Sequence, residues 1–273
     1  MKNKKKLARN VIIQTLVEAL KPLDYVHAFY EGGAAAFNRV DEWSDIDLYL
    51  IVDDDKVDET FRTVEEALKT MSPIKQKYKP PQLPWPDIYQ AFYRLEGASE
   101  YLIIDLAVLK LGSPEKFLDP EIHGNVVFYF NKNSKIKASP LDEEAFEKKL
   151  RERLERLQAR FAMFSNFVQK EINRGNSLEA IDLYYNLTLA TLVEALRIKH
   201  NPVHYDFKMR YVHYELPPET IKKLERLYSV RDKDDLQEKY ISAVDWFHKT
   251  VLEINKKQKM SNTTCCLKEA NKE

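Results

Sequence analysis

Two carboxylates placed two residues apart give the strongest chemical signal in the sequence. Asp45 and Asp47 open an apolar run, residues 45–52, that has the alternating pattern of a strand. Side chains at positions i and i+2 of a strand point to the same face. Two carboxylates held this close repel each other unless a cation lies between them. Oxygen ligands of this kind suit Mg²⁺, which commonly binds one or two carboxylates together with substrate phosphates.

A pair of glycines precedes these acids. The chain has six glycines in 273 residues, and Gly32 and Gly33 are adjacent. Glycine is used where the backbone must turn freely or where a ligand approaches the backbone closely. The alanines at 34–36 predict a brief helix whose first amides face this turn, an arrangement that attracts phosphate.

A third acid, Asp105, lies inside the apolar run YLIIDLAVL. A charge within such a run is costly unless it is paired or bound to a metal. Each signal alone has a simpler reading, because Asp-x-Asp also occurs at solvated edges and Gly-Gly in plain turns. The combination of all three favours a functional site.

The pattern of elements predicts an α+β protein with two domains. The first part combines helices and strands into a mixed sheet, with helices expected at 5–20 and 56–70 and strands at 25–30, 45–52, 88–95, 100–109 and 125–130. Residues 75–87, with four prolines between 80 and 86, predict a loop. From Pro140 onward the apolar residues recur at helical spacing, which predicts an all-α helical bundle. The expected domains are 1–138 (catalytic) and 139–256 (helical bundle), followed by a disordered tail at 257–273.

Composition limits the classes of function. Lys+Arg and Asp+Glu both number 43, so the net charge is zero, and a nucleic-acid partner is not expected. The sequence has no run of 18 apolar residues, so no membrane span is expected. Its two cysteines, Cys265 and Cys266, are adjacent in the polar tail, so they cannot form a disulfide that links distant segments of the fold. These features predict a cytoplasmic protein.

The spacing of these motifs resembles the nucleotidyltransferase superfamily, whose fold is shared with DNA polymerase beta. The resemblance rests on Gly32-Gly33, then eleven residues, then Asp-x-Asp within WSDIDLYLIV, then Asp105 on a later strand. The helical second half is similar in layout to the small-molecule branch, the kanamycin and lincosamide nucleotidyltransferase type.

The resemblance implies a Mg²⁺-dependent enzyme that uses ATP or another nucleoside triphosphate. Two Mg²⁺ ions would be held by Asp45, Asp47 and Asp105, and a substrate hydroxyl would attack the α-phosphorus with release of pyrophosphate. Asp105 is nearest in role to the general base. In the kanamycin type a glutamate of the helical domain serves instead, and Glu194 is the candidate here.

The resemblance also assigns the nucleotide contacts. Gly32 and Gly33 would offer backbone amides to the phosphates, and Ser44 a hydroxyl. Many members carry Arg-Gly after the glycine pair, whereas this chain has alanines there, and Arg39 is the candidate replacement. Lys208 would hold phosphates from the helical half.

Simpler readings remain for three of these residues. Ser44 would cap the start of the strand, and Glu194 would form an ion pair with Arg197 three residues later on its helix. Lys208 would pair with surface acids.

The acceptor expected from the resemblance is a small hydroxylated molecule such as an aminoglycoside or a lincosamide, with a homodimer as a further possibility. Two other hypotheses stay open. One is an enzyme that modifies a partner protein, as in toxin–antitoxin pairs. The other is an inactive module that only binds a nucleotide, which the presence of all three carboxylates disfavours.

Overall fold

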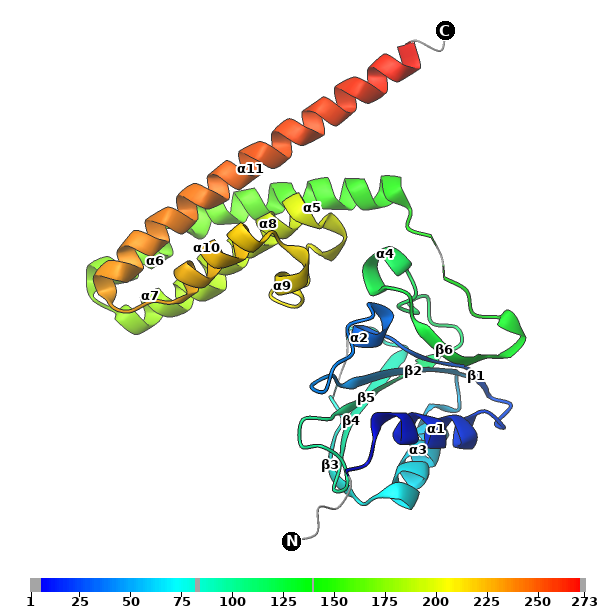
Figure 1. The fold of residues 1–273 in the computed structure, drawn as a ribbon. Helices are drawn as coiled ribbons and strands as arrows, with labels where there is room; N and C mark the ends of the chain where they lie inside the picture. Colours follow the sequence, from blue (N-terminus) through cyan, green and yellow to red (C-terminus); the bar gives the residue numbers. More distant parts are fainter. Residues whose placement is uncertain (1–5, 82–83, 139, 271–273) are drawn as a thin grey trace. The chain divides into compact units, whose positions relative to one another are not determined.

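The computed structural model describes residues 6–81, 84–138 and 140–270. The chain separates into two compact units, Met1–Leu141 and Asp142–Glu273, a division close to the predicted boundary. The first unit combines a mixed sheet with helices and the second is helical, which confirms the α+β class predicted from the sequence (Figure 1).

The first unit is built on one six-stranded sheet with the strand order β3-β4-β5-β2-β1-β6. Its strands are β1 (Val26–Glu31), β2 (Ile46–Val52), β3 (Ile74–Tyr78), β4 (Ile88–Leu95), β5 (Ile104–Lys110) and β6 (Val127–Asn131). Strands β2 and β5 pair in parallel, and the other neighbours pair antiparallel. The two parallel strands therefore lie at the centre of the sheet and begin at the same edge.

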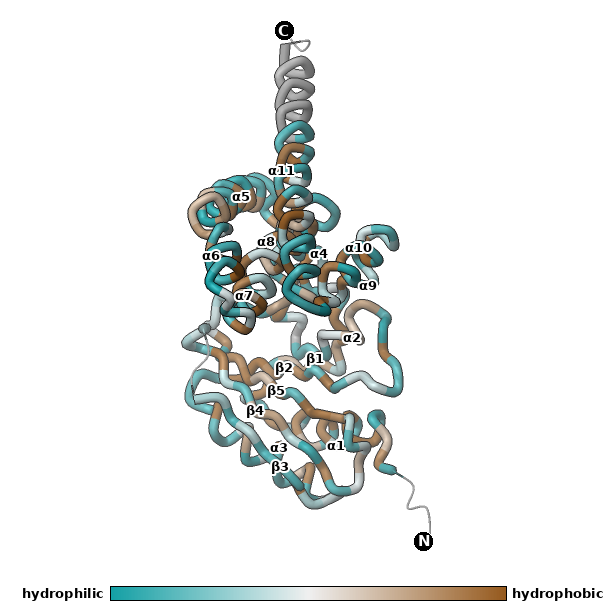
Figure 2. Tube along the Cα trace, turned by 90° about the vertical axis from the view of Figure 1, so that its left-hand side faces the viewer, coloured by the Kyte–Doolittle hydropathy of each residue, from teal (hydrophilic) through white to brown (hydrophobic). Residues whose placement is uncertain are grey.

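Helices α1 (Arg9–Leu20) and α3 (Val57–Met71) cover one face of this sheet (Figure 1). Ile46, Leu48 and Leu50 of β2 point into the core beneath them, as the alternation of the sequence predicts. Short helices follow β1 and precede β6, namely α2 (Gly33–Ala36) and α4 (Pro120–His123), and a 3₁₀ turn, η1 (Lys132–Ser134), follows β6. Hydrophobic residues mark the central strands β2 and β5 (Figure 2).

The prediction of a plain loop over 75–87 was wrong at its start, because β3 pairs with β4 there. Four of the five residues of β3 are exposed. An edge strand that is solvated on both faces needs no apolar alternation, so periodicity could not reveal it.

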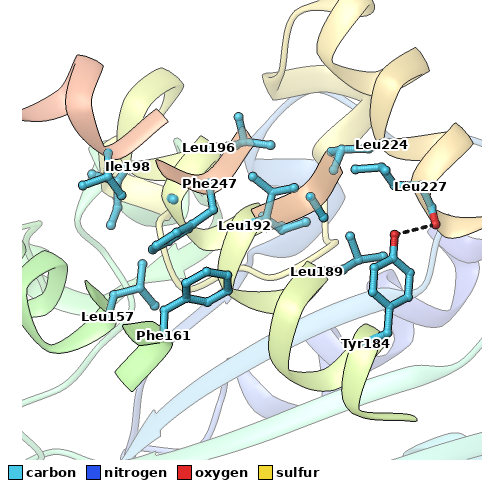
Figure 3. Close-up of a cluster of buried hydrophobic side chains, with 14 of the residues drawn as sticks. Leu157, Phe161, Tyr184, Leu189, Leu192, Leu196, Ile198, Leu224, Leu227 and Phe247 are labelled. Atoms are coloured by element: carbon cyan, nitrogen blue, oxygen red, sulfur yellow. Dashed lines mark hydrogen bonds between the residues drawn. The ribbon is translucent and has the colours of Figure 1, made fainter. Parts of the chain in front are cut away.

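The second unit is a bundle of helices. They are α5 (Glu143–Phe164), α6 (Phe167–Arg174), α7 (Ser177–Leu183), the π-helical turn η2 (Tyr184–Leu189), α8 (Ala190–His200), the 3₁₀ turn η3 (Pro202–His204), α9 (Val212–Glu215), α10 (Pro218–Tyr228) and α11 (Lys233–Ala270). Its core joins α5, α8 and α11, and the buried ring of Phe161 lies 4.0 Å from that of Phe247 (Figure 3). The hydroxyl of Tyr184 donates to the carbonyl of Leu227 at 3.0 Å, which ties η2 to α10 (Figure 3).

Two features of this unit differ from the sequence expectation. The helix predicted at 178–199 contains the π-helical turn η2, and α11 continues to Ala270 where a disordered tail was expected from residue 257. Residues 271–273 of that expected tail lie outside the described residues. Within the described part of the chain, no helix is both long and apolar enough to cross a membrane.

Candidate active site

Asp47 and Asp105 lie side by side at the start of the two parallel strands. The register pairs Asp47 of β2 directly with Asp105 of β5. Partners on neighbouring parallel strands are about 4.8 Å apart along the hydrogen-bonding direction, and their side chains point to the same face. Both acids are half-buried, whereas the residues on either side of each in its strand are buried. The sheet therefore joins two acids that are far apart in the sequence.

Asp45 lies just before β2, beside the start of β5. Its carboxylate Oδ1 accepts a hydrogen bond from the backbone N–H of Ile103 at 3.0 Å. Its backbone carbonyl accepts one from the Arg9 guanidinium at 2.5 Å. These contacts fix Asp45 at the same edge of the sheet as Asp47 and Asp105.

The glycine pair packs against Asp47. The N–H of Gly32 donates to the carbonyl of Asp47 at 2.9 Å. Gly33 has a φ of +53°, and a Cβ at this position would overlap the carboxylate of Asp47. A Cβ on Gly32 would lie 2.9 Å from the ring of Tyr49. Only glycine lets the backbone approach this carboxylate so closely, so position 33 cannot accept a side chain without moving Asp47.

Gln90 is a further residue of the site that the sequence reading missed. Its side-chain Nε2 donates to Oδ1 of Asp105 at 2.6 Å from the neighbouring strand β4. This bond fixes the orientation of the Asp105 carboxylate. The available signal was a lone amide within the apolar strand pattern IYQAFYRL.

A buried ion pair, which the sequence reading also missed, connects helix α1 to this edge of the sheet. Arg9 of α1 pairs with Glu31 at the end of β1, where the Glu31 side chain is 4% exposed. Tyr129 donates its hydroxyl to the same carboxylate. Burial lowers the pKa of Arg9, and the nearby groups Tyr129, Asp47 and Asp45 partly offset this effect. Arg9 thus ties α1 to the end of β1 and the start of β2.

Ser44 and Arg39 have local contacts in this unit. The hydroxyl of Ser44 donates to the carboxylate of Asp41 at 2.8 Å and accepts from the Asp41 backbone N–H at 2.9 Å. The hydrogen bond from Ser44 lowers the pKa of Asp41. Ser44 therefore closes the turn before β2, in line with its simpler reading. The guanidinium of Arg39 lies 5.1 Å from the centre of the Phe37 ring.

Glu194 and Lys208 belong to the second unit. Both carboxylate oxygens of Glu194 accept hydrogen bonds from Arg153, at 2.5 and 2.8 Å. The predicted pair of Glu194 with Arg197 was wrong, because the fully buried Arg197 pairs instead with Glu215 at 2.7 Å. An i, i+3 spacing allows two side chains to meet but does not stop either from finding a partner on another segment.

Lys208 has a φ of +53° and its carbonyl accepts a hydrogen bond from Nε of Arg197 at 2.6 Å. Among the described residues its ammonium group forms no ion pair, so the predicted pairing with surface acids is not seen. Glu194 and Lys208 both line a cavity of about 500 Å³ within the helical unit.

The donor chemistry of the first unit fits a hard cation. Asp45, Asp47 and Asp105 offer only carboxylate oxygens, the ligands that Mg²⁺ takes in proteins. Across residues 6–81, 84–138 and 140–270, no three His, Cys, Asp or Glu side chains are grouped closely enough to hold a metal ion. Oδ1 of Asp45 and Oδ1 of Asp105 are held by Ile103 and Gln90, so a shared ion would require these carboxylates to turn inward.

No protein-family profile and no curated protein sequence matches the chain. Solved structures do match over most of its length. An aminoglycoside 6-adenyltransferase from Bacillus subtilis is 16% identical with a TM-score of 0.38, covering 92% of this chain and 91% of its own. A spectinomycin adenyltransferase from Enterococcus faecialis, solved with ATP and spectinomycin, is 12% identical with a TM-score of 0.34, covering 92% and 100%. A c-di-GMP synthase from Capnocytophaga granulosa is 11% identical with a TM-score of 0.30, covering 90% and 79%.

Two of these structures are described as adenyltransferases and the third as a c-di-GMP synthase. TM-scores below 0.5 are weak likenesses, so the assignment of chemistry depends on the residues of the site itself.

Proposed function

We propose that this protein is a Mg²⁺-dependent nucleotidyltransferase that moves a nucleoside monophosphate, AMP from ATP by preference, onto a hydroxyl of a small molecule. The observation that supports this most directly is the direct pairing of Asp47 with Asp105, with the backbone of Gly33 packed against the Asp47 carboxylate. Two carboxylates on neighbouring strands beside a side-chain-free turn fit a cation and a phosphate chain better than a purely structural role.

One bond forms and one bond breaks in the proposed reaction. The acceptor oxygen forms a bond to the α-phosphorus, the bond from that phosphorus to the β-phosphate oxygen breaks, and pyrophosphate leaves. The acceptor proton passes to a base. Mg²⁺ held by Asp45, Asp47 and Asp105, as two ions in this proposal, would neutralise phosphate charge and lower the pKa of the attacking hydroxyl. Phosphoryl transfer depends mainly on positioning and on this neutralisation, so few other groups are needed.

The other residues serve to position these groups. Gly32 and Gly33 allow the phosphates to approach backbone amides, and Gln90 holds Asp105 in a fixed orientation. Ser44, Arg39 and Lys208 stay proposals for phosphate contacts.

Two carboxylates compete for the role of general base. Asp105 lies in the site, next to Asp47. Glu194 stays the alternative from the helical unit, where Arg153 competes with any substrate hydroxyl for both of its oxygens. Comparing the pH dependence of single-turnover rates in Glu194→Gln and Asp105→Asn separates the two, because only the loss of the base removes the acidic limb, the fall in rate as that base becomes protonated.

The acceptor class, an aminoglycoside or lincosamide, is proposed from the resemblance of the motif. Pyrophosphate release in the presence of each acceptor measures it directly. Release with partner proteins alone would instead favour the protein-modifying alternative.

A thermal-shift panel tests the proposed site before the acceptor is known. ATP, GTP, CTP and UTP are each added with and without Mg²⁺, and a bound nucleotide raises the melting temperature according to RT ln(1+[L]/Kd). We expect a shift that needs Mg²⁺ and that disappears in Asp47→Asn. Asp58→Asn is the matched control, because the Asp58 side chain is 90% exposed on α3. An unchanged shift in Asp47→Asn would contradict the proposal.

A further inference from the structure

The cavity of the helical unit has the size and the lining of a small-molecule site. Its volume is about 500 Å³, within the range of ligand pockets in proteins. It lies among α5, the η2 turn with the start of α8, the loop at 205–209 and the end of α10. All of these segments belong to one compact unit, so the cavity does not depend on how the two units are arranged.

Tyrosine rings form a rigid wall of this cavity. The rings of Tyr185 and Tyr228 stack with centroids 5.6 Å apart and an angle of 22° between their planes. The Tyr185 hydroxyl donates to the carbonyl of Tyr228 at 2.8 Å, which fixes the first ring against the end of α10. Held aromatic faces can pack on the ring of a ligand while losing little side-chain entropy.

The backbone beneath this wall is unusual. Tyr185 and Asn186 are part of the π-helical turn η2, which spans Tyr184–Leu189 between two regular helices. Such turns are rare and occur frequently at functional sites, because the extra residue displaces side chains from the normal helical spacing. Here the turn places both Tyr185 and Asn186 in the cavity lining.

The charges of the lining favour an acidic ligand. It contains three cationic side chains, Arg153, Arg160 and Lys208, and two carboxylates, Glu194 and Asp206. Glu194 is already paired through both oxygens with Arg153. Arg160 and Lys208 form no ion pair with any described residue, and only the carboxylate of Asp206 is left to offset them, so a net positive charge remains at the cavity. A guanidinium is well suited to bind a carboxylate or phosphate through two hydrogen bonds.

We propose that this cavity binds a hydroxylated ring compound that carries a carboxylate or phosphate group. The ring packs on Tyr228, the hydroxyl groups bond to polar groups such as Asn186, and the acid group pairs with Arg160. Glu194 and Lys208 of the lining are also candidates in the proposed nucleotidyl transfer, but Arg160, Asn186 and Tyr228 have no part in it. The cavity would bind its ligand without nucleotide or Mg²⁺.

Binding to the full chain, measured by ligand-observed NMR without nucleotide or Mg²⁺, tests this assignment. Four probes share one ring and differ in charge: glucose 6-phosphate and glucuronate are anionic, glucose is neutral and glucosamine is cationic. We expect both anionic probes to bind at least about tenfold more tightly than glucose, and glucosamine to bind most weakly.

Variants then locate the binding. Arg160→Gln should weaken both anionic probes by about tenfold and leave glucose unchanged. Arg156→Gln is its matched control, because Arg156 lies on the same helix with a side chain that is 61% exposed and does not line the cavity. Tyr228→Leu should weaken all four probes alike, and Asp47→Asn, in the other unit, should weaken none.

Three results would overturn the assignment: no probe binds, glucosamine binds as well as the anionic sugars, or Arg160→Gln binds the anions as tightly as Arg156→Gln does. If the anionic probes bind but Asp47→Asn abolishes their binding, they occupy the site of Asp47 and Asp105 instead. The assignment to this cavity is then wrong. Failure of the nucleotide thermal shift would leave these results unaffected, so the two proposals fail separately.

Discussion

Asp47 and Asp105 are direct partners across β2 and β5, the parallel pair at the centre of the sheet. This register is strongly constrained, because a slip of one residue would move Ile46 and Leu48 out of the core formed with α1 and α3. The same packing that stabilises the sheet therefore keeps the two carboxylates on one face, next to the glycine turn.

Replacing Asp105 with Asn removes one charge from this pair without changing its shape. We expect pyrophosphate release to fall by at least about 10³-fold, since a metal-stabilised transition state is worth several kcal/mol. Steady-state release assays measure this loss, with Asp58→Asn as the surface control. Activity near that of the control would exclude Asp105 from the chemistry.

Gly33→Ala separates a steric effect from a backbone effect. The new Cβ would displace the Asp47 carboxylate, and the φ of +53° adds a penalty of about 1–2 kcal/mol. Gly175→Ala carries a similar penalty at a φ of +81°, but its Cβ would meet nothing within 4 Å. We expect urea unfolding to show a loss of stability in both variants and the Mg²⁺-dependent nucleotide shift to vanish only in Gly33→Ala. Retention of that shift would mean that Asp47 is not needed for binding.

Gln90→Met tests the orientation of Asp105. Methionine has a similar length but cannot donate the 2.6 Å hydrogen bond to the carboxylate. We expect kcat to fall by about tenfold, the cost of one hydrogen bond to a charged group, with a smaller change in the KM for the nucleotide. A pure fall in stability with unchanged kcat would show that Gln90 only supports the sheet.

The buried ion pair of Arg197 and Glu215 predicts a pH-dependent stability. Burial raises the pKa of Glu215, but the hydrogen bond from Arg197 and the contact with His204 outweigh it, so the net pKa is lowered. A lowered folded-state pKa means that this stabilisation is complete above the unfolded value of about 4.3 and is lost as the pH falls below it. We expect the free energy of unfolding to drop in this acidic range.

Urea titrations between about pH 3 and pH 7 measure this effect. Glu215→Gln should cost about 3–5 kcal/mol near neutral pH, since it leaves Arg197 buried without its charge partner, and should flatten the acidic drop. Glu225→Gln, on the exposed side of α10, should behave as the unchanged protein. Parallel pH curves for both variants would refute the role given to Glu215.

The sequence by itself determined the features that depend on local pattern. The period of two over 46–52 marked β2 and its buried face, the apolar run around Asp105 marked another strand, and helical spacing separated the second unit from the first. These patterns work because each residue's environment repeats with the geometry of its own strand or helix.

Only the tertiary structure decided which residues meet. It paired Asp47 with Asp105, supplied Gln90 from β4, set Arg9 against Glu31, and gave Glu194 the partner Arg153 in place of Arg197. Strand register, strand order and contacts between helices join segments far apart in the chain. Periodicity shows which face of a segment is buried, but it does not specify the segment that will cover that face.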